Sequence, residues 1–294
     1  MRFELAGSQI YLDTLVLRFT ANGNFDTLKY VDLGYTHFDV ICIGGGGGMG
    51  GGIDTANTGT LIRSYGGAGG GGGFHRVRGL LSALADTVPI VVGAGGAVGA
   101  EHASNPALTA DGGDGGYSSF NSAQLTCQAS GGKGGKRVQS NSLTVSTVAD
   151  GGQGGMGNRT AAGGGAAGGV AGIPSSGGPG TPGTPGKDGV LFANVGQGGG
   201  GGAGGVGKYG SGGTTCNAAT AGGRGSYNPA DISVYGTGEG PGHDPASGSQ
   251  NVLPGGASGA KTSPLTGLPT IFGQSKGTRV PGAAGIVVVR LTAE

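Results

Sequence analysis

The stretch FDVICIGGGGGMGGG, residues 38–52, decides the fold, because an apolar β-strand pattern runs directly into eight glycines and one methionine. Gly45, Gly47 and Gly50 fit the dinucleotide-binding pattern G-x-G-x-x-G after a strand. That pattern needs a helix opening at the third glycine and an acidic residue about twenty positions later. The following segment, GGIDTANTGTLIRS (51–64), has no helical period. The stretch therefore predicts glycine-based structure and no cofactor.

Glycine dominates the rest of the chain as well. Of 294 residues, 77 are Gly and 13 are Pro, while only 35% are hydrophobic and 5% aromatic. This composition is typical of low-complexity chains, and it supplies too few large apolar side chains for a conventional core of this length. An ordered fold must then be held by closely packed backbones that carry no Cβ.

Glycine blocks recur from Gly44 onward at a spacing of about twenty residues, which is typical of repetitive architectures. The segment GGPGTPGTPGKDG (177–189) has glycine at every third position, a polyproline II pattern. A polyproline II segment has no internal hydrogen bonds, so when buried it must pair with neighbours, which only glycine lets approach on all sides. We predict that blocks 44–52, 66–73 and 198–207 are packed rods. The glycines expected to hold this lattice include Gly45, Gly47, Gly70 and Gly201.

The fold class that follows is mostly β and irregular, with almost no α-helix. Residues 1–43 contain only three glycines and predict an N-terminal β module, including a hairpin around the Asn-Gly turn at 21–24. The polyproline II bundle is expected over 44–294, closed by strand 285–291. Strands 38–43 and 87–92 are expected beside one another in a sheet at the same end, and 80–86 can form only a short helical turn.

Composition and motifs exclude several function classes. The net charge of +1 gives no basic surface for nucleic acid, and no apolar run is long enough to cross a membrane. The N-terminus lacks a signal-peptide pattern. Cys42, Cys127 and Cys216 are an odd, widely spaced set, which favours free thiols in a chain made in a reducing cytoplasm.

No catalytic or metal motif is complete. GAGGVGKY (202–209) has the spacing of a P-loop, but Tyr209 replaces the hydroxyl residue that holds Mg²⁺. DGGDGG (111–116) does not recur as a calcium-binding nonapeptide, and the four histidines lie far apart. We expect no enzyme, no metal and no cofactor.

Several stretches in order carry a resemblance to the glycine-rich tail proteins of bacteriophages, including minor tail proteins of actinobacterial phages. They are FTANGNFDTLKYVDLGYTHFDVICIGGGGG (19–48), GGAGGGGGFHRVRGLLSALADTVPIVVGAGGAVG (66–99), GGDGGYSSFNSAQLTCQASGGKGG (112–135) and GAAGIVVVRLTAE (282–294). The architecture is also similar to distal tail-fibre adhesins of T-even-like phages, in which polyproline II helices pack as a sandwich. This chain differs from those adhesins in lacking aromatic-rich loops.

The resemblance implies a structural minor tail protein at the tail tip or fibre that contributes to host attachment. It implies a place in the virion tail after assembly in the host cytoplasm, with other tail proteins and a host-surface glycan or protein as partners. A homotrimer is expected and a monomer is the alternative. The other function class is a free glycine-rich binding protein, either ice-binding or secreted and mycobacterial. An ice binder should show disulfides and a flat, regular Thr or Ala face, and the three unpaired cysteines and irregular connecting segments of this chain argue against that alternative.

The residues that contact a receptor can be predicted by counting connections. If successive rods run up and down, the segments 53–65, 97–111, 136–150, 214–221 and 243–254 lie at the end far from strand 38–43. These segments contain the candidate receptor-contact residues Arg63, Tyr65, His102, Arg137 and His243. Their side chains can stack on a ligand or donate hydrogen bonds to it.

Overall fold

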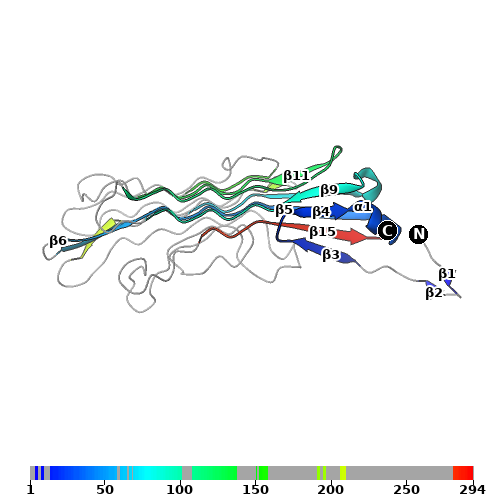
Figure 1. Cartoon of the computed structure of the whole chain (residues 1–294), viewed down its shortest axis with the longest axis horizontal. Helices are drawn as coiled ribbons and strands as arrows, with labels where there is room; N and C mark the ends of the chain where they lie inside the picture. Colours follow the sequence, from blue (N-terminus) through cyan, green and yellow to red (C-terminus); the bar gives the residue numbers. More distant parts are fainter. Residues whose placement is uncertain are drawn as a thin grey trace.

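The computed structural model places β-strands at one end of an elongated molecule and extended rods along the rest of it (Figure 1). It describes residues 14–57, 60–64, 66–67, 69–100, 108–137, 150, 152–157 and 281–293, with four short segments at 4–5, 8–9, 191–192 and 195–196 and a strand at 206–209.

Two antiparallel sheets form the β end. The larger has the order β12 (Leu191–Phe192), β13 (Val195–Gly196), β8 (Phe74–Leu80), β5 (His37–Ile43), β15 (Ile286–Thr292) and β3 (Leu15–Phe19). The smaller has the order β11 (Thr126–Ala129), β10 (Ser118–Asn121), β9 (Thr87–Val91) and β4 (Gly23–Asp26). Their strands come from both sides of residue 43, so the segment 1–43 shares its sheets with later parts of the chain.

The remaining elements are small. β1 (Glu4–Leu5) pairs with β2 (Ser8–Gln9), and a three-stranded sheet has the order β14 (Val206–Tyr209), β7 (Thr60–Ser64) and β6 (Ile53–Asn57). The one α-helix in the described part, α1 (Thr27–Asp32), begins at Asp26, whose carboxylate accepts a hydrogen bond from the Lys29 N–H (3.1 Å). The 3₁₀ turn η1 (Leu81–Ala83) is the short helical turn expected at 80–86.

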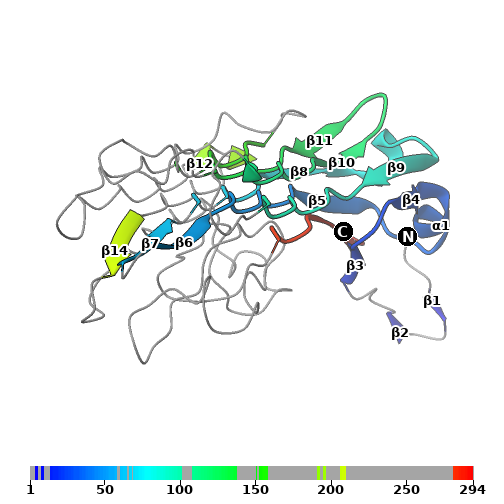
Figure 2. The same ribbon diagram turned by 60° about the vertical axis from the view of Figure 1, so that its left-hand side comes forward.

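The side chains between the two sheets form the main core. Phe38, Val40 and Cys42 alternate along β5 toward this interior, as a period of two requires. They meet Phe120 of β10 and Cys127 of β11. Figure 2 shows these two strands next to β8 and β5 of the larger sheet. A second buried cluster, with Ile41, Ile43, Phe74, Ile286 and Val288, lies on the opposite face of the larger sheet. The strands β5 and β15 are thus apolar on both faces, which explains their nearly continuous apolar sequences.

The predicted rods 44–52 and 66–73 are present where the structure describes them, whereas the described end of the third predicted block, residues 206–207, pairs with β7 in strand β14 (Val206–Tyr209) and is not a rod. Rod 44–52 continues from β5 and is completely buried. Its N–H groups donate to rod 66–73 at every third residue: Gly44 to Gly73 (3.1 Å), Gly47 to Gly70 (2.8 Å) and Gly50 to Gly67 (2.9 Å). Gly45, Gly48 and Gly51 donate in the same way to Gly116, Gly113 and Ala110 of rod 108–116. A repeat of three residues is that of the polyproline II helix, and a β-ladder repeats every two.

Glycine is required in this lattice because neighbouring backbones leave no space for a Cβ. A Cβ on Gly47 would lie 2.1 Å from the Lys133 carbonyl oxygen, and one on Gly70 would lie 2.0 Å from that of Gln153. The same holds for Gly45, whose Cβ would meet the Ala94 oxygen at 2.1 Å. Gly201 lies outside the described residues, as do residues 198–205 of the third predicted block.

Two predictions about the β end are wrong. The Asn-Gly segment at 21–24 does not join a hairpin, because β3 pairs with β15 and β4 pairs with β9 in the other sheet. Asn22 instead accepts a hydrogen bond from the Val92 N–H (2.8 Å), and a helix follows β4. Strand 87–92 forms as β9 at the same end as β5, but in the facing sheet rather than beside it.

The strands fix the direction of the rods, since each rod is continuous with a strand of the β end. Rods 44–52, 93–100 and 130–137 leave β5, β9 and β11, while rods 66–73, 108–116 and 281–285 lead into β8, β10 and β15. Successive rods among these six therefore run alternately away from the β end and toward it, which confirms for them the up-and-down course assumed when the connections were counted. No helix in the described part of the chain has the length and apolar character needed to cross a membrane.

Candidate functional site

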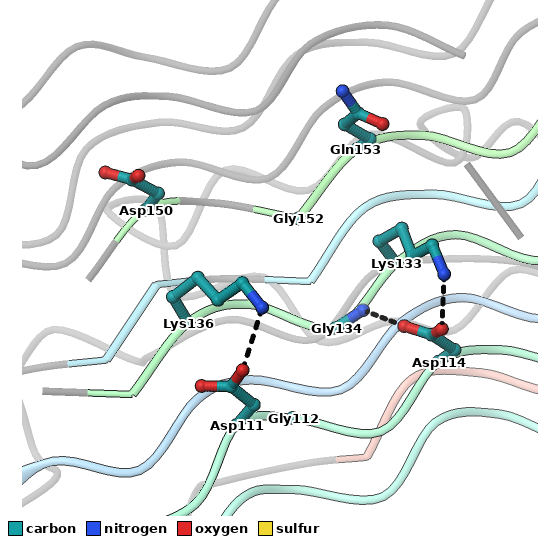
Figure 3. Close-up of a pocket in the computed structure, with 9 residues that line it drawn as sticks. All are labelled: Asp111, Gly112, Asp114, Lys133, Gly134, Lys136, Asp150, Gly152 and Gln153. Atoms are coloured by element: carbon teal, nitrogen blue, oxygen red, sulfur yellow. Dashed lines mark hydrogen bonds and ion pairs between the residues drawn. The ribbon is translucent and has the colours of Figure 1, made fainter. Parts of the chain in front are cut away.

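A groove of about 690 Å³ runs along one face of the bundle, over rods 108–116, 130–137 and 150–157 (Figure 3). We call it the charged groove. Six polar side chains and three glycines line it: Asp111, Asp114, Lys133, Lys136, Asp150, Gln153, Gly112, Gly134 and Gly152.

Each aspartate of rod 108–116 holds the neighbouring rod by two contacts. Asp114 accepts a hydrogen bond from the Gly134 N–H through Oδ1 (2.9 Å) and one from Lys133 Nζ through Oδ2 (2.7 Å). Asp111 repeats this three residues earlier, with the Arg137 N–H (2.9 Å) and Lys136 Nζ (2.8 Å). These carboxylates therefore take the place of the backbone acceptors that pair rods in the interior.

The third wall of the groove is rod 150–157. Its carbonyl groups accept from rod 130–137 at every third residue, Asp150 from the Lys136 N–H and Gln153 from the Lys133 N–H, both at 2.8 Å. Gln153 is exposed. In the groove, each of the three rods thus presents two polar side chains three residues apart, as Figure 3 shows.

The charges of the groove perturb one another. Burial raises the pKa of the Asp111 carboxyl, but the hydrogen bonds from Lys136 and the Arg137 N–H, with the charges of both residues, lower it below its usual value overall. The hydrogen bond to Asp111 and the charge of that residue raise the pKa of Lys136; burial opposes this, and Asp114 and Asp150 add smaller contributions. Both groups are therefore held in their charged forms.

The groove contains donors and acceptors in a repeating array but no nucleophile paired with a base. Within the described residues, no group of three or more His, Cys, Asp or Glu side chains is placed to hold a metal ion. The arrangement is suited to binding an extended polar ligand.

A second polar cluster lies on the outer face of the larger sheet. Asp39 of β5 accepts a hydrogen bond from Arg76 Nε (2.8 Å) and a further contact from the other end of that guanidinium, and it also pairs with Arg78 (3.1 Å). Because Arg76 and Asp39 are mostly buried, this bidentate pair fixes the register of β5 and β8.

Two buried thiols lie between the sheets. Cys42 Sγ donates to the Cys127 carbonyl (3.3 Å), and Cys127 Sγ donates to the His75 carbonyl (3.5 Å). Burial raises the pKa of Cys42, and its neighbour Cys127 raises it further. Burial also lowers the pKa of His75, against the opposing effect of a hydrogen bond from its ring to the Gln128 carbonyl. The pKa shifts of Cys42 and His75 both favour the neutral form, as expected for side chains of a structural core. Cys216 lies outside the described residues.

The structure places only some of the predicted receptor-contact residues. Arg63 lies in β7, in the hairpin with β6 at the end opposite the sheets (Figure 1). Arg137 is the last described residue of rod 130–137, at the end of that rod far from the two large sheets. There its N–H donates to Asp111 and its guanidinium donates to the Thr109 carbonyl (2.7 Å). Tyr65, His102 and His243 lie outside the described residues. The charged groove brings Arg137 beside its lining residues and does not include Arg63.

The groove was missed by the sequence prediction, although the sequence carries its signal. DGGDGG (111–116), KGGK (133–136) and DGGQGG (150–155) each place a polar residue every third position. Since a polyproline II rod has three residues per turn, this spacing puts the polar side chains on one face.

One comparison with known proteins covers nearly the whole chain. The family model described as a glycine-rich domain matches residues 20–292. The chain belongs to this family. The match begins directly after β3 and extends to the last residue of β15, so all the described rods and every strand of the two sheets except β3 fall within the glycine-rich domain. No curated protein matches the chain significantly.

Proposed function

We propose that this glycine-rich domain protein is a structural component of a bacteriophage tail, at the tip or on a fibre, and that it contributes to attachment to the host cell. The proposal rests on the ordered resemblance of four segments to phage tail proteins. It is supported by the shape of the bundle, which projects its rods away from a β end that contains β1 and β15 (Figure 1).

The structural observation that supports the proposal is that several rods have their ends together, opposite the two large sheets. The residues that flank three connections lie together at the far end: Ala100 accepts from the Ala110 N–H (3.1 Å), Lys136 donates to Asp150 (2.8 Å), and Gly50 donates to Gly67 (2.9 Å). A bundle whose described rod ends gather at one end, with the two large sheets at the other, is suited to hold a contact surface away from its attachment point. The partners are then other tail proteins at the β end and a host glycan or protein at the far end.

Labelling of particles tests the location. We expect gold-conjugated antibody fragments against the chain to mark the tail tip or fibre of phage particles whose genome encodes it. Particles that carry no label anywhere, while the purified chain is recognised, would refute the tail assignment.

Competition for host cells tests the attachment role separately. Purified protein should slow adsorption of the phage, and Arg63→Ala at the far end should weaken this inhibition. The matched control is Arg78→Ala, an exposed arginine at the β end. Equal loss in both variants would contradict a far-end contact surface. Native mass measurement distinguishes the expected homotrimer from a monomer.

A regular row of alanines favours a second candidate, an ice-binding protein. Ala94, Ala97 and Ala100 of rod 93–100 are all exposed and three residues apart, about 9.3 Å along a polyproline II helix. Thermal hysteresis of the purified protein decides: a measurable freezing-point gap supports ice binding, and freezing at the equilibrium point excludes it.

A further inference from the structure

The charges of the groove balance one another. Three carboxylates are matched by three cations, on Asp111, Asp114, Asp150, Lys133, Lys136 and Arg137. Two of the carboxylates are ion-paired with the lysines at 2.7 and 2.8 Å, and Asp150 and Arg137 make further interactions of their own. Among the described residues the groove therefore has no excess of either charge. A ligand recognised there must gain its affinity from hydrogen bonds and packing.

Each ion pair keeps hydrogen-bonding capacity on its solvent side. A carboxylate has about four lone-pair sites, and Asp114 uses two of them, for Lys133 Nζ and for the Gly134 N–H. An ammonium group has three N–H donors, of which Lys133 uses one within the described part of the chain. The pair of Lys136 and Asp111 repeats this arrangement. Because the four side chains are 42–53% exposed, each pair offers solvent a donor and an acceptor side by side.

A hydroxyl group is the ligand atom that matches such a pair, because the same oxygen donates one hydrogen bond and accepts others. A neutral sugar carries hydroxyls on neighbouring carbons, so it can contact carboxylate and ammonium together without bringing a charge into the groove. The exposed Gln153 amide adds one carbonyl acceptor and two N–H donors on the third rod. A peptide backbone, in contrast, separates its donors and acceptors onto different atoms.

An exposed aromatic ring continues the aspartate row. Tyr117 follows Asp114 by three residues, which is one turn of a polyproline II helix, and it is 39% exposed. Since Asp114 pairs with the Gly134 N–H and the rods are antiparallel, Tyr117 lies level with Gly131, one turn nearer the β end. Its side chain makes no hydrogen bond or ring contact within the described part of the chain. The ring thus offers an apolar face and a hydroxyl to a ligand in the groove.

The groove also has room for a saccharide. Gly112, Gly134 and Gly152 alternate with the polar residues of its lining, so no side chain projects from these positions (Figure 3). Its volume of about 690 Å³ lies within the range of about 300–1,000 Å³ that ligand sites occupy. A sugar has an apolar C–H face beside its rim of hydroxyls, and the aromatic ring and the polar rows provide for both.

We propose that the charged groove, together with Tyr117, binds a neutral linear oligosaccharide. Its hydroxyls contact the two Asp–Lys pairs and Gln153, and one sugar ring stacks on Tyr117. This inference does not rest on the tail assignment, because it concerns binding by the purified chain in solution, whereas the tail assignment is tested on particles. Either can fail without the other.

An array of neutral and anionic glycans is the probe, read with the biotinylated full chain on labelled streptavidin, whose multivalency reveals weak binding. We expect binding to neutral linear oligosaccharides. For the strongest of these, calorimetry should give a Kd of about 10⁻⁴ M. Because the ligand carries no charge, this Kd should change by less than about twofold between about 0.02 M and about 0.15 M salt.

Two pairs of matched variants locate the site. Tyr117→Ala removes the stacking ring and should weaken binding by about 3–10-fold, while Leu80→Ala, at a 50% exposed apolar residue of the β end, should leave the Kd within about twofold. Gln153→Ala should weaken binding by about threefold or more, while Gln124→Ala, in the connection between β10 and β11, should have no such effect. All four residues are exposed, so the variants should fold, which circular dichroism verifies.

Three results would overturn the proposal. The first is an array on which no neutral glycan binds, including one on which only anionic glycans do. The second is an affinity that falls steeply with salt, which would show that charge attracts the ligand. The third is a Tyr117→Ala or Gln153→Ala protein that binds as tightly as its matched control, which would place the ligand outside the groove.

Discussion

The replacement of Gly47 by alanine probes the lattice at its most enclosed rod. The added Cβ would lie 2.1 Å from the Lys133 carbonyl oxygen, 2.5 Å from its carbon and 3.0 Å from the Gly134 nitrogen. Ordinary contact begins at 3.4 Å, so rod 130–137 must move away by 3.4 − 2.1 = 1.3 Å. Such a shift would stretch the flanking 2.9 Å bonds, from Gly132 to Gly45 and from Gly135 to Gly48, to about 4.2 Å.

The expected cost follows from those lost contacts. Two or three buried hydrogen bonds at about 1–1.5 kcal/mol each, with their packing, give a loss of about 3–5 kcal/mol in the free energy of unfolding. For a chain of this size that corresponds to a fall in Tm of roughly 6–20 °C. Thermal and urea denaturation followed by circular dichroism measure both quantities.

Gly23 supplies the matched control for this substitution. It lies in the edge strand β4, and a Cβ built there has no neighbour within 4 Å. Gly23→Ala should therefore change the free energy of unfolding by no more than about 1 kcal/mol, in either direction. A Gly47→Ala protein that melts within about 2 °C of the parent would refute close backbone packing.

Three further predictions concern the charged groove and the buried thiols. Asp114→Ala removes one ion pair and the acceptor of one backbone N–H. We expect it to lower the free energy of unfolding, measured by urea denaturation, by about 0.5–1.5 kcal/mol. This loss should be largely insensitive to salt if the N–H contact dominates. The pKa of the Asp111 carboxyl is lower in the folded state, so the stability that it contributes is present above its unfolded pKa and is lost as pH falls through its folded pKa. The difference in unfolding free energy between wild type and Asp111→Asn, measured by denaturation, should therefore shrink as the pH falls from about 6 to about 2. In a Cys216→Ser background, Cys42 and Cys127 should react with a thiol reagent only after denaturant is added, and rapid labelling of the native protein would contradict their burial.

The sequence predicted the parts of the fold that local chemistry determines. Strands 38–43, 87–92 and 285–291 were recognisable because each is a β-branched, apolar run. β5 and β15 are covered on both faces, as such runs suggest, whereas β9 alternates between exposed and buried residues. The rods were recognisable because glycine blocks of this length are unfavourable in helices and gain little in ordinary strands. Both inferences use only neighbouring residues.

The errors came from partners distant in sequence. An Asn-Gly pair favours a hairpin, but β3 pairs with β15, whose residues lie more than 260 positions later, and Asn22 contacts Val92 instead. No local pattern specifies those partners. The helix α1 was missed because its six residues carry too little periodicity, although Asp26 provides an N-cap.

The candidate site was predictable in principle from spacing. DGGDGG was considered only as a calcium-binding motif, whereas its recurrence with KGGK and DGGQGG at the same three-residue period indicates a shared face. What the sequence did not specify is which rods are neighbours, and therefore that Asp114 meets Lys133 across two of them.

Scalar couplings across backbone hydrogen bonds test the central claim, that glycine backbones pair in polyproline II conformation, most directly. In a ¹⁵N,¹³C-labelled sample, the amides of Gly44, Gly47 and Gly50 should correlate with the carbonyls of Gly73, Gly70 and Gly67 respectively. The account predicts this progression, in which the donor advances by three residues while the acceptor falls by three. Correlations advancing by two residues, or no correlations among these glycines in a folded sample, would contradict it.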